Sequence, residues 1–226
     1  APARHDVGMA SRSTSASDAI SFTGEILAVK ARIRLCRSYD QVHHQYQGYT
    51  LVLAGEIDGE LRDSIRIGIG PAAHAKHEFR IGDQVRGRAL PVPEPKTEWA
   101  EYYKASGLKI VARGPESEAR PADPDGGIAP PLDEYRANGH LRLDKRTLDT
   151  MCTRCPFGLT MATEITPDHW NPSRKRWRHE THCYGPRDCP RYRPGKARSV
   201  PGRQPGMSWT DDDYERYQDD LPRRNE

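Results

Sequence analysis

The chain has 226 residues, of which 35% are hydrophobic and 30% charged, and it contains 19 glycines and 19 prolines. This length predicts one or two small domains, and the glycine and proline content predicts that much of the chain is loop or tail. No run approaches the roughly 18 apolar residues of a membrane-spanning helix, so we expect a soluble protein with no membrane partner. The net charge of +3 is too small on its own to indicate nucleic-acid binding.

The first half of the chain is predicted to form strands. Residues 1–20 lack the apolar core of a secretory signal and are expected to be disordered. Between Gly24 and Arg37, apolar residues alternate with basic ones, which predicts a half-buried strand with one apolar and one basic face. Further strands are predicted at 49–54, 64–69, 81–90 and 108–112, with a helix of about two turns at 71–79.

Three strands, a short helix and two strands is the element order of an OB-fold, a small Greek-key barrel. Residues 21–113 resemble this fold, and the turn and strand Gly82-Asp83-x-Val85-x-Gly87 add to the resemblance. OB-folds commonly bind oligonucleotides on one face, and basic side chains expected on the outside here would suit that role: Lys30, Arg32, Arg34, Arg66, Arg86 and Arg88. Alternatively, these residues only keep the outside polar and deter edge pairing.

The second half is predicted to contain a linker and a small module. Residues 114–150 begin with a segment rich in proline and glycine and form a linker and lead-in to a cysteine-rich module at 151–205. Acidic residues dominate the tail at 206–226. The predicted fold class is therefore mostly β: an OB-like barrel, a Pro/Gly-rich linker, a metal-stapled cysteine module and disordered tails.

Four of the five cysteines have the spacing of a metal site. Cys152 and Cys155 form a C-x2-C pair, and Cys183 and Cys189 form a C-x5-C pair after 27 intervening residues. A C-x2-C turn presents two thiolates to one ion, and a second pair completes the tetrahedral set of structural Zn²⁺. The absence of a secretory signal favours a metal over disulfides, because the cytoplasm is reducing.

The ligand set and the metal stay open at this point. His179 and His182 precede Cys183 as substitute ligands, although we expect His182 to be second shell or solvent-facing. Cys-Pro steps at 155 and 189 keep an iron–sulfur cluster as the alternative cofactor.

A basic and aromatic run overlaps the cysteine module. Residues 172–203 are rich in Arg and Lys and hold only two acidic residues, Glu180 and Asp188. Guanidinium groups contact phosphates and aromatic faces stack on unpaired bases, so this mixture suits a single strand or an RNA loop. The candidate contact residues are Trp170, Arg174, Lys175, Arg176, Trp177, Arg178, Tyr184, Arg187 and Arg191. The alternative is a solvated basic face.

The whole chain also resembles an uncharacterised bacterial family in which an OB-like domain precedes a four-cysteine metal-binding module. The resemblance rests on Tyr-Arg-Ala-Asn-Gly-His at 135–140, Trp-Asn-Pro at 170–172 and Cys-Tyr-Gly-Pro at 183–186. It implies an architecture and no particular activity.

Signatures of common catalytic sites are absent from the sequence, including G-x-S-x-G, the Walker loop and H-E-x-x-H. We therefore expect a cytoplasmic, non-catalytic protein that binds single-stranded or structured RNA, or single-stranded DNA, and carries a structural zinc site. Two alternatives remain: an iron–sulfur redox or sensor protein, and a protein-interaction adaptor whose partner recognises the acidic tail.

Overall fold

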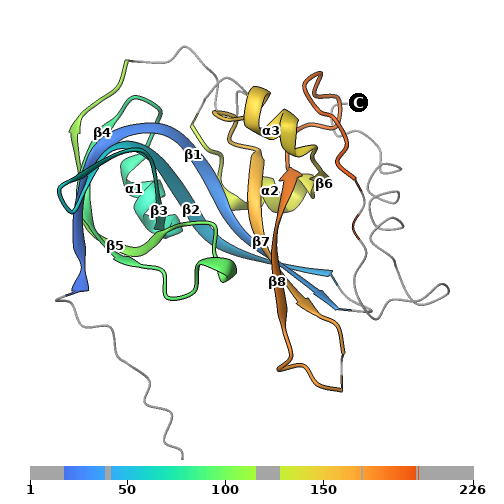
Figure 1. The fold of residues 1–226 in the computed structure, drawn as a ribbon. Helices are drawn as coiled ribbons and strands as arrows, with labels where there is room; N and C mark the ends of the chain where they lie inside the picture. Colours follow the sequence, from blue (N-terminus) through green and yellow to red (C-terminus); the bar gives the residue numbers. More distant parts are fainter. Residues whose placement is uncertain (1–17, 39–41, 116–127, 169, 197, 199–226) are drawn as a thin grey trace, which may run out of the picture.

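The computed structural model describes residues 18–38, 42–115, 128–168, 170–196 and 198. Eight strands form one sheet in the order β2-β3-β5-β4-β1-β7-β8-β6, with an additional pairing of β2 with β1 (Figure 1). The prediction of a mostly β protein is confirmed. The predicted acidic tail lies outside the described residues, as do the predicted disordered N-terminus up to residue 17 and the linker residues 116–127.

The first five strands form a partly closed ring. Strand β1 pairs with β2 on one side and β4 on the other, β2 pairs with β3, and β4 pairs with β5, all antiparallel. A single parallel pair, Ile67 opposite Tyr102, joins β3 to β5. The elements are β1 (Ile20–Ser38), β2 (Val42–Ile57), β3 (Glu60–Ile69), α1 (Pro71–His77), β4 (Gln84–Pro91), the short 3-10 helix η2 (Pro95–Thr97) and β5 (Tyr102–Ala112).

Alternating side chains explain why the ring has a filled interior. The predicted apolar positions of β1 and β3 are all buried: Val29, Ala31, Ile33, Leu35, Ile65, Ile67 and Ile69. Gly24 and Gly55 face each other across β1 and β2, and a side chain at 24 would lie 2.5 Å from the Ala54 carbonyl oxygen. These glycines therefore allow the two strands to approach closely where they bend around the core.

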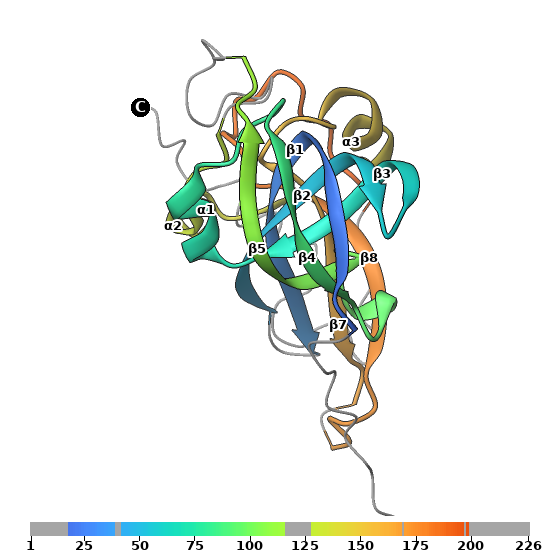
Figure 2. The ribbon, with the colours of Figure 1, turned by 90° about the vertical axis from the view of Figure 1, so that its left-hand side faces the viewer.

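The C-terminal elements extend the same sheet. Strand β7 runs parallel to the end of β1, with Leu35 opposite Thr163, and β8 pairs with β7. The β7–β8 hairpin projects away from the ring (Figures 1 and 2). The elements are α2 (Leu132–Asn138), β6 (Leu141–Arg142), α3 (Lys145–Met151), β7 (Gly158–Thr166) and β8 (Arg176–Cys183).

The regions 21–113 and 151–205, which the sequence suggests are two units, share one core. Leu148, Phe157 and Tyr184 belong to the same buried apolar cluster as the ring residue Leu35. Strand β1 has 19 residues and is much longer than β4. Its last residues, Leu35–Ser38, extend beyond the part that pairs with β4 and pair with β7 instead.

Candidate metal centre and nucleic-acid surface

Local structure brings the predicted metal ligands toward one end of the hairpin. The Asp144 carboxylate caps helix α3 by accepting a 2.9 Å hydrogen bond from a backbone N–H of the first turn, and Cys152 follows the last turn. Cys155 lies in the turn that leads into β7, and Cys183 is the last residue of β8. Because β7 and β8 are antiparallel, Cys183 lies opposite Gly158 at the start of β7.

Close packing draws the two cysteine pairs together. A side chain at Gly158 would lie 2.9 Å from the Cβ atom of Cys152, so only glycine fits between this cysteine and the strand. The backbone N–H of Gly185 donates to the Sγ atom of Cys183 at 3.4 Å, which favours a thiolate at that sulfur. Cys189 is half-buried, whereas the other three thiols are buried.

Burial raises the pKa values of two of these thiols, and other cysteines of the set contribute to both shifts. The pKa of Cys183 is raised to about 12, chiefly by burial; the other three thiols of the set act in the same direction, and the hydrogen bond from Gly185 acts against them. Burial also raises the pKa of Cys152, with Lys30 and Arg191 acting in the opposite direction. The raised pKa values of Cys152 and Cys183 favour the protonated thiols when no cation is bound, whereas a coordinating thiol is deprotonated by its metal.

Lys30 lies directly beneath the C-x2-C turn. Only 4% of this residue is exposed, and its ammonium donates three hydrogen bonds to backbone carbonyls, at 2.7 Å to Cys152, 2.6 Å to Cys155 and 2.9 Å to Gly158. Burial lowers the pKa of Lys30 to about 8, and the nearby cysteines oppose that effect. A buried cation is costly unless it is paired, and a set of four thiolates around one dication would supply the negative charge.

The donor chemistry fits zinc, although the thiols do not form a closed site. Within the described ranges, no group of three or more His, Cys, Asp or Glu side chains has an arrangement that holds a metal ion. The cysteine residue types, the hydrogen bond to the Cys183 sulfur and the buried Lys30 ammonium nearby are nevertheless compatible with the donor chemistry of a tetrathiolate site. Cys152, Cys155, Cys183 and Cys189 are the residues that would hold the ion.

The two histidines next to the last cysteine pair differ in position. His179 is exposed on β8, whereas His182 is fully buried, with its ring 5.0 Å from that of His140. The solvent-facing alternative for His182 is therefore wrong.

The structure contradicts two of the predicted nucleic-acid contacts, because both side chains are buried. Lys30 is covered by the cysteine turn, because the C-terminal half packs on the face of β1 that the alternation assigns to solvent. Tyr184 is fully buried, and its ring lies 6.0 Å from the ring of Tyr135. Neither side chain is available to a ligand at the surface.

Several other predicted contacts lie in ion pairs with acidic side chains. Such pairing reduces the charge that these residues present to a polyanion. The pairs are Arg32 with Glu98 at 2.6 Å, Arg66 with Glu101 at 3.7 Å, Lys175 with Glu164 at 2.6 Å, and Arg178 with Glu180.

The far end of the β7–β8 hairpin presents an aromatic and basic surface. Trp170 is 85% exposed, and Arg174 and Arg176 are exposed beside it in the sequence. The guanidinium of Arg34 lies 5.2 Å from the ring centroid of Trp177, and the same group donates a 3.2 Å hydrogen bond to the Thr97 carbonyl. This contact fixes Trp177 against the ring of strands. Arg176 and Trp177 are consecutive in β8 and therefore lie on opposite sides of it, so we use the name hairpin face for the whole end of the hairpin that carries Trp170, Arg174, Arg176 and Trp177.

A second basic surface lies elsewhere on the ring. Arg86 and Arg88 are exposed on β4, and Lys109 of β5 lies opposite Arg86. Together they line a shallow groove of about 430 Å³. Arg187 and Arg191 are half-buried on the segment that carries Cys189, and neither is among the residues that line this groove.

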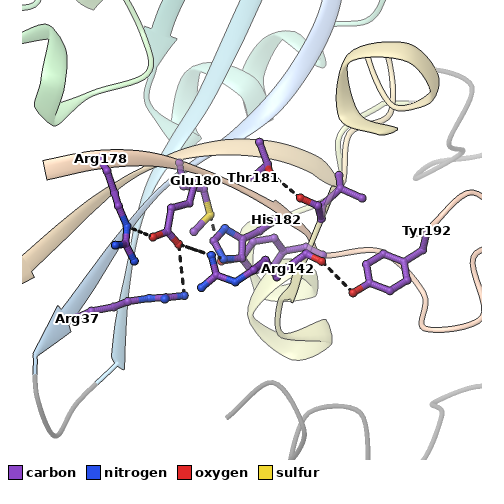
Figure 3. Close-up of polar contacts among 10 residues, drawn as sticks. Arg37, Arg142, Arg178, Glu180, Thr181, His182 and Tyr192 are labelled. Carbon is purple, nitrogen blue, oxygen red and sulfur yellow. Dashed lines mark hydrogen bonds and ion pairs between the residues drawn. The ribbon is translucent and has the colours of Figure 1, made fainter. Parts of the chain in front are cut away.

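A buried ionic cluster was missed by the sequence analysis. The Glu180 carboxylate is paired with Arg142 at 3.0 Å, with Arg37 at 3.6 Å and with Arg178 (Figure 3). Burial alone would raise the pKa of Glu180, but the three arginines lower it below its ordinary value. Because these residues come from β1, β6 and β8, the cluster ties the hairpin to the ring.

Three histidine rings line the same interior. His140 lies 4.6 Å from His44 and 5.0 Å from His182 between ring centroids. Burial lowers the pKa of His44 to about 4 and that of His140 well below its ordinary value, with Arg37 adding to both effects. Residues 178, 180 and 182 are polar and occupy every second position of β8. In the sequence this pattern is typical of the solvent-facing side of a strand, so the buried cluster could not be recognised.

No protein-family model, curated protein or solved structure matches this chain. No helix in the described part of the chain is long and apolar enough to cross a membrane. The fold and the site thus define a mostly β protein with a cysteine cluster at the base of a projecting basic hairpin, and its function has to be argued from these features.

Proposed function

We propose that this protein binds single-stranded nucleic acid through the hairpin face and that its four cysteines hold a structural zinc ion. The observation that carries the proposal is Trp170, a tryptophan that is 85% exposed on a hairpin that also exposes Arg174 and Arg176. Exposed aromatic rings stack on unpaired bases, and neighbouring guanidinium groups contact phosphates.

The arrangement of the ring supports an OB-like barrel for residues 21–113. Strand β1 is bordered by β2 and β4, and helix α1 lies between β3 and β4, as in the predicted order of elements. Barrels of this kind bind oligonucleotides in many proteins. The groove with Arg86, Arg88 and Lys109 would then extend the binding surface beyond the hairpin.

The proposed zinc ion has a structural role. The three buried cysteines belong to the same apolar core as the ring, and Lys30 joins the C-x2-C turn to β1 through its three hydrogen bonds. Zinc held by four thiolates stabilises a fold without opening a coordination position for catalysis. Thiolates persist in a reducing compartment, which supports a cytoplasmic location.

The test is the nucleic acid that co-purifies with the full chain. We expect the wild type to retain nuclease-sensitive material, and we expect a variant with Trp170→Ala, Arg174→Ala and Arg176→Ala to lose most of it. Lys76→Ala is the matched control, because Lys76 is exposed on α1, away from the hairpin in both views (Figures 1 and 2). Equal retention by the two variants would contradict the proposal.

Zinc is distinguished from an iron–sulfur cluster by elemental analysis and by colour. The proposal predicts one zinc per chain and no absorption in the visible range. Stoichiometric iron with a visible absorption band would show that the cofactor is an iron–sulfur cluster and not zinc, and would favour a redox or sensor protein.

A further inference from the structure

A cleft lies between the ring and the C-terminal elements. Its volume is about 820 Å³, which falls in the range of sites that bind small organic molecules. Arg66, Trp99 and Tyr102 line it from the ring, and Leu148, Thr160 and His179 line it from α3, β7 and β8. The cleft is therefore assembled only when the two halves of the chain pack together.

Trp99 lines this cleft and is held in place by its neighbours. The guanidinium of Arg66 lies 5.5 Å from the Trp99 ring centroid, and its Nε donates a 2.9 Å hydrogen bond to the Trp99 carbonyl. The Glu98 carboxylate accepts a 3.0 Å hydrogen bond from the Trp99 backbone N–H and is itself held by Arg32 at 2.6 Å. A ring fixed in this way loses little conformational entropy when a planar guest stacks on it.

The charges around the cleft favour a neutral guest over a phosphate. Each lysine or arginine that lines it in the described chain already has partners: three carbonyls for Lys30, Glu101 at 3.7 Å for Arg66, and Asp149 at 2.7 Å for Lys145. A phosphate would have to compete with these partners, whereas a neutral heteroaromatic ring would not. Thr160 and His179 supply hydrogen-bonding groups for the edge of such a ring.

Strand β8 carries one residue of the cleft and two residues of the hairpin face. Trp177 and His179 are two positions apart on this strand, so they lie on the same side of it, about 7 Å apart along its axis. His179 lines the cleft, and Trp177 belongs to the hairpin face. A nucleic-acid strand bound along the hairpin face would thus reach the entrance of the cleft.

From these contacts we infer that the cleft binds a nucleobase, stacked on Trp99 and contacted at its edge by Thr160 and His179. This inference rests on the proposed function, in which the base belongs to the bound single strand. The phosphates then stay outside, beside Arg174 and Arg176.

The test combines protein variants with oligonucleotides that lack one base. Short oligouridylates with an abasic site at each position in turn are titrated against the full chain, and binding is followed by fluorescence anisotropy. For the wild type we expect one position at which the missing base weakens binding by about 5- to 150-fold, the range of a single stacking contact. Trp99→Leu should weaken binding of the complete strand by a similar factor and remove the effect of that abasic position.

Two further variants separate stacking from folding. Trp99→Phe keeps an aromatic face and should preserve the position-dependent effect, and Trp170→Leu should weaken binding while leaving that effect intact. Thermal unfolding of each variant identifies any that fail to fold.

The possible outcomes distinguish this inference from the proposed function. Binding of the complete strand with no sensitive position, or with Trp99→Leu equal to the wild type, would overturn the inference and leave the proposed function standing. Failure of every oligonucleotide to bind, with free uridine quenching the tryptophan fluorescence of the wild type but not that of Trp99→Leu, would overturn the proposed function and keep a nucleobase cleft. Failure of both probes would overturn both.

Discussion

The ammonium group of Lys30 donates a 2.6 Å hydrogen bond to the backbone carbonyl of Cys155, from a strand 125 residues earlier in the chain. This contact links the first strand of the ring to the turn that carries half of the proposed metal ligands. It holds the cysteine turn against the ring, and together with the pairing of β1 with β7 and the shared core it joins the two halves.

Lys30→Met tests this link. The substitution keeps an unbranched side chain but leaves three buried carbonyl groups without their donor, so we expect the free energy of unfolding to fall by about 3 kcal/mol or more. Zinc affinity should fall as well, because the buried positive charge no longer offsets the thiolates. Chemical denaturation and competition with a zinc-binding dye measure the two effects. Lys109→Met, at an exposed position on β5, is the control and should change neither.

Cys155→Ser tests the metal centre. The variant should lose stoichiometric zinc, and its unfolding midpoint should fall in a single transition because the cysteines and the ring share one core. Cys36→Ser is the control, since Cys36 lies on β1 outside the proposed ligand set. Elemental analysis and calorimetry provide the measurements. A Cys155→Ser protein that keeps its zinc would remove this residue from the ligand set.

Much of the ring could be predicted from the sequence, whereas the environment of its outer face could not. The alternation in β1 and β3 correctly identifies Ile33 and Ile65 as buried. The same alternation places Lys30 at the surface, because period two distinguishes the two faces of a strand but does not reveal what packs on each. Only the long-range contact with the cysteine turn buries it.

The buried ionic cluster shows the same limit. Glu180 and its arginine partners come from strands far apart in the sequence, and a polar residue at every second position is typical of a solvent-facing strand. The exposed Trp170 and the spacing of the cysteines, in contrast, depend on local sequence and could be identified directly.

Acid should destabilise the protein through its buried histidines. The folded state lowers the pKa of His44 to about 4 and that of His140 below its ordinary value, so the unfolded state binds more protons once the pH falls below about 6.5. Stability should therefore be lost as the pH falls from about 6.5 toward 4, by up to about 3 kcal/mol for His44. Arg37 and His43, which repel a proton on His44, add to the effect of burial.

His44→Phe provides the check on this pH dependence. The variant keeps an aromatic ring of similar size next to His140 but cannot take up a proton. Denaturation curves across this pH range should show a weaker acid dependence than the wild type. His43→Phe, at the exposed neighbouring position, should retain most of the dependence of the wild type, because His43 is the smallest of the causes that lower the pKa of His44. Identical slopes for all three proteins would contradict the assignment.

Salt should separate the two kinds of contact on the hairpin face. Each phosphate contact on a single strand contributes about −0.7 to the log–log slope of affinity against salt. Replacing Arg174 and Arg176 by Ala should flatten this slope, whereas Trp170→Ala should weaken binding by about 1–3 kcal/mol and leave the slope nearly unchanged. Titrations at several salt concentrations measure both quantities. A slope that changes equally in the arginine and tryptophan variants would argue against separate phosphate and base contacts.

The central claim, recognition of single strands by the zinc-loaded protein, is tested most directly by equilibrium titration at low salt with a fluorescent single strand and the duplex of the same sequence. We expect the single strand to bind more tightly than the duplex, because stacking on Trp170 and Trp99 requires unpaired bases. Equal affinity for the two forms, or no binding of either, would contradict the account.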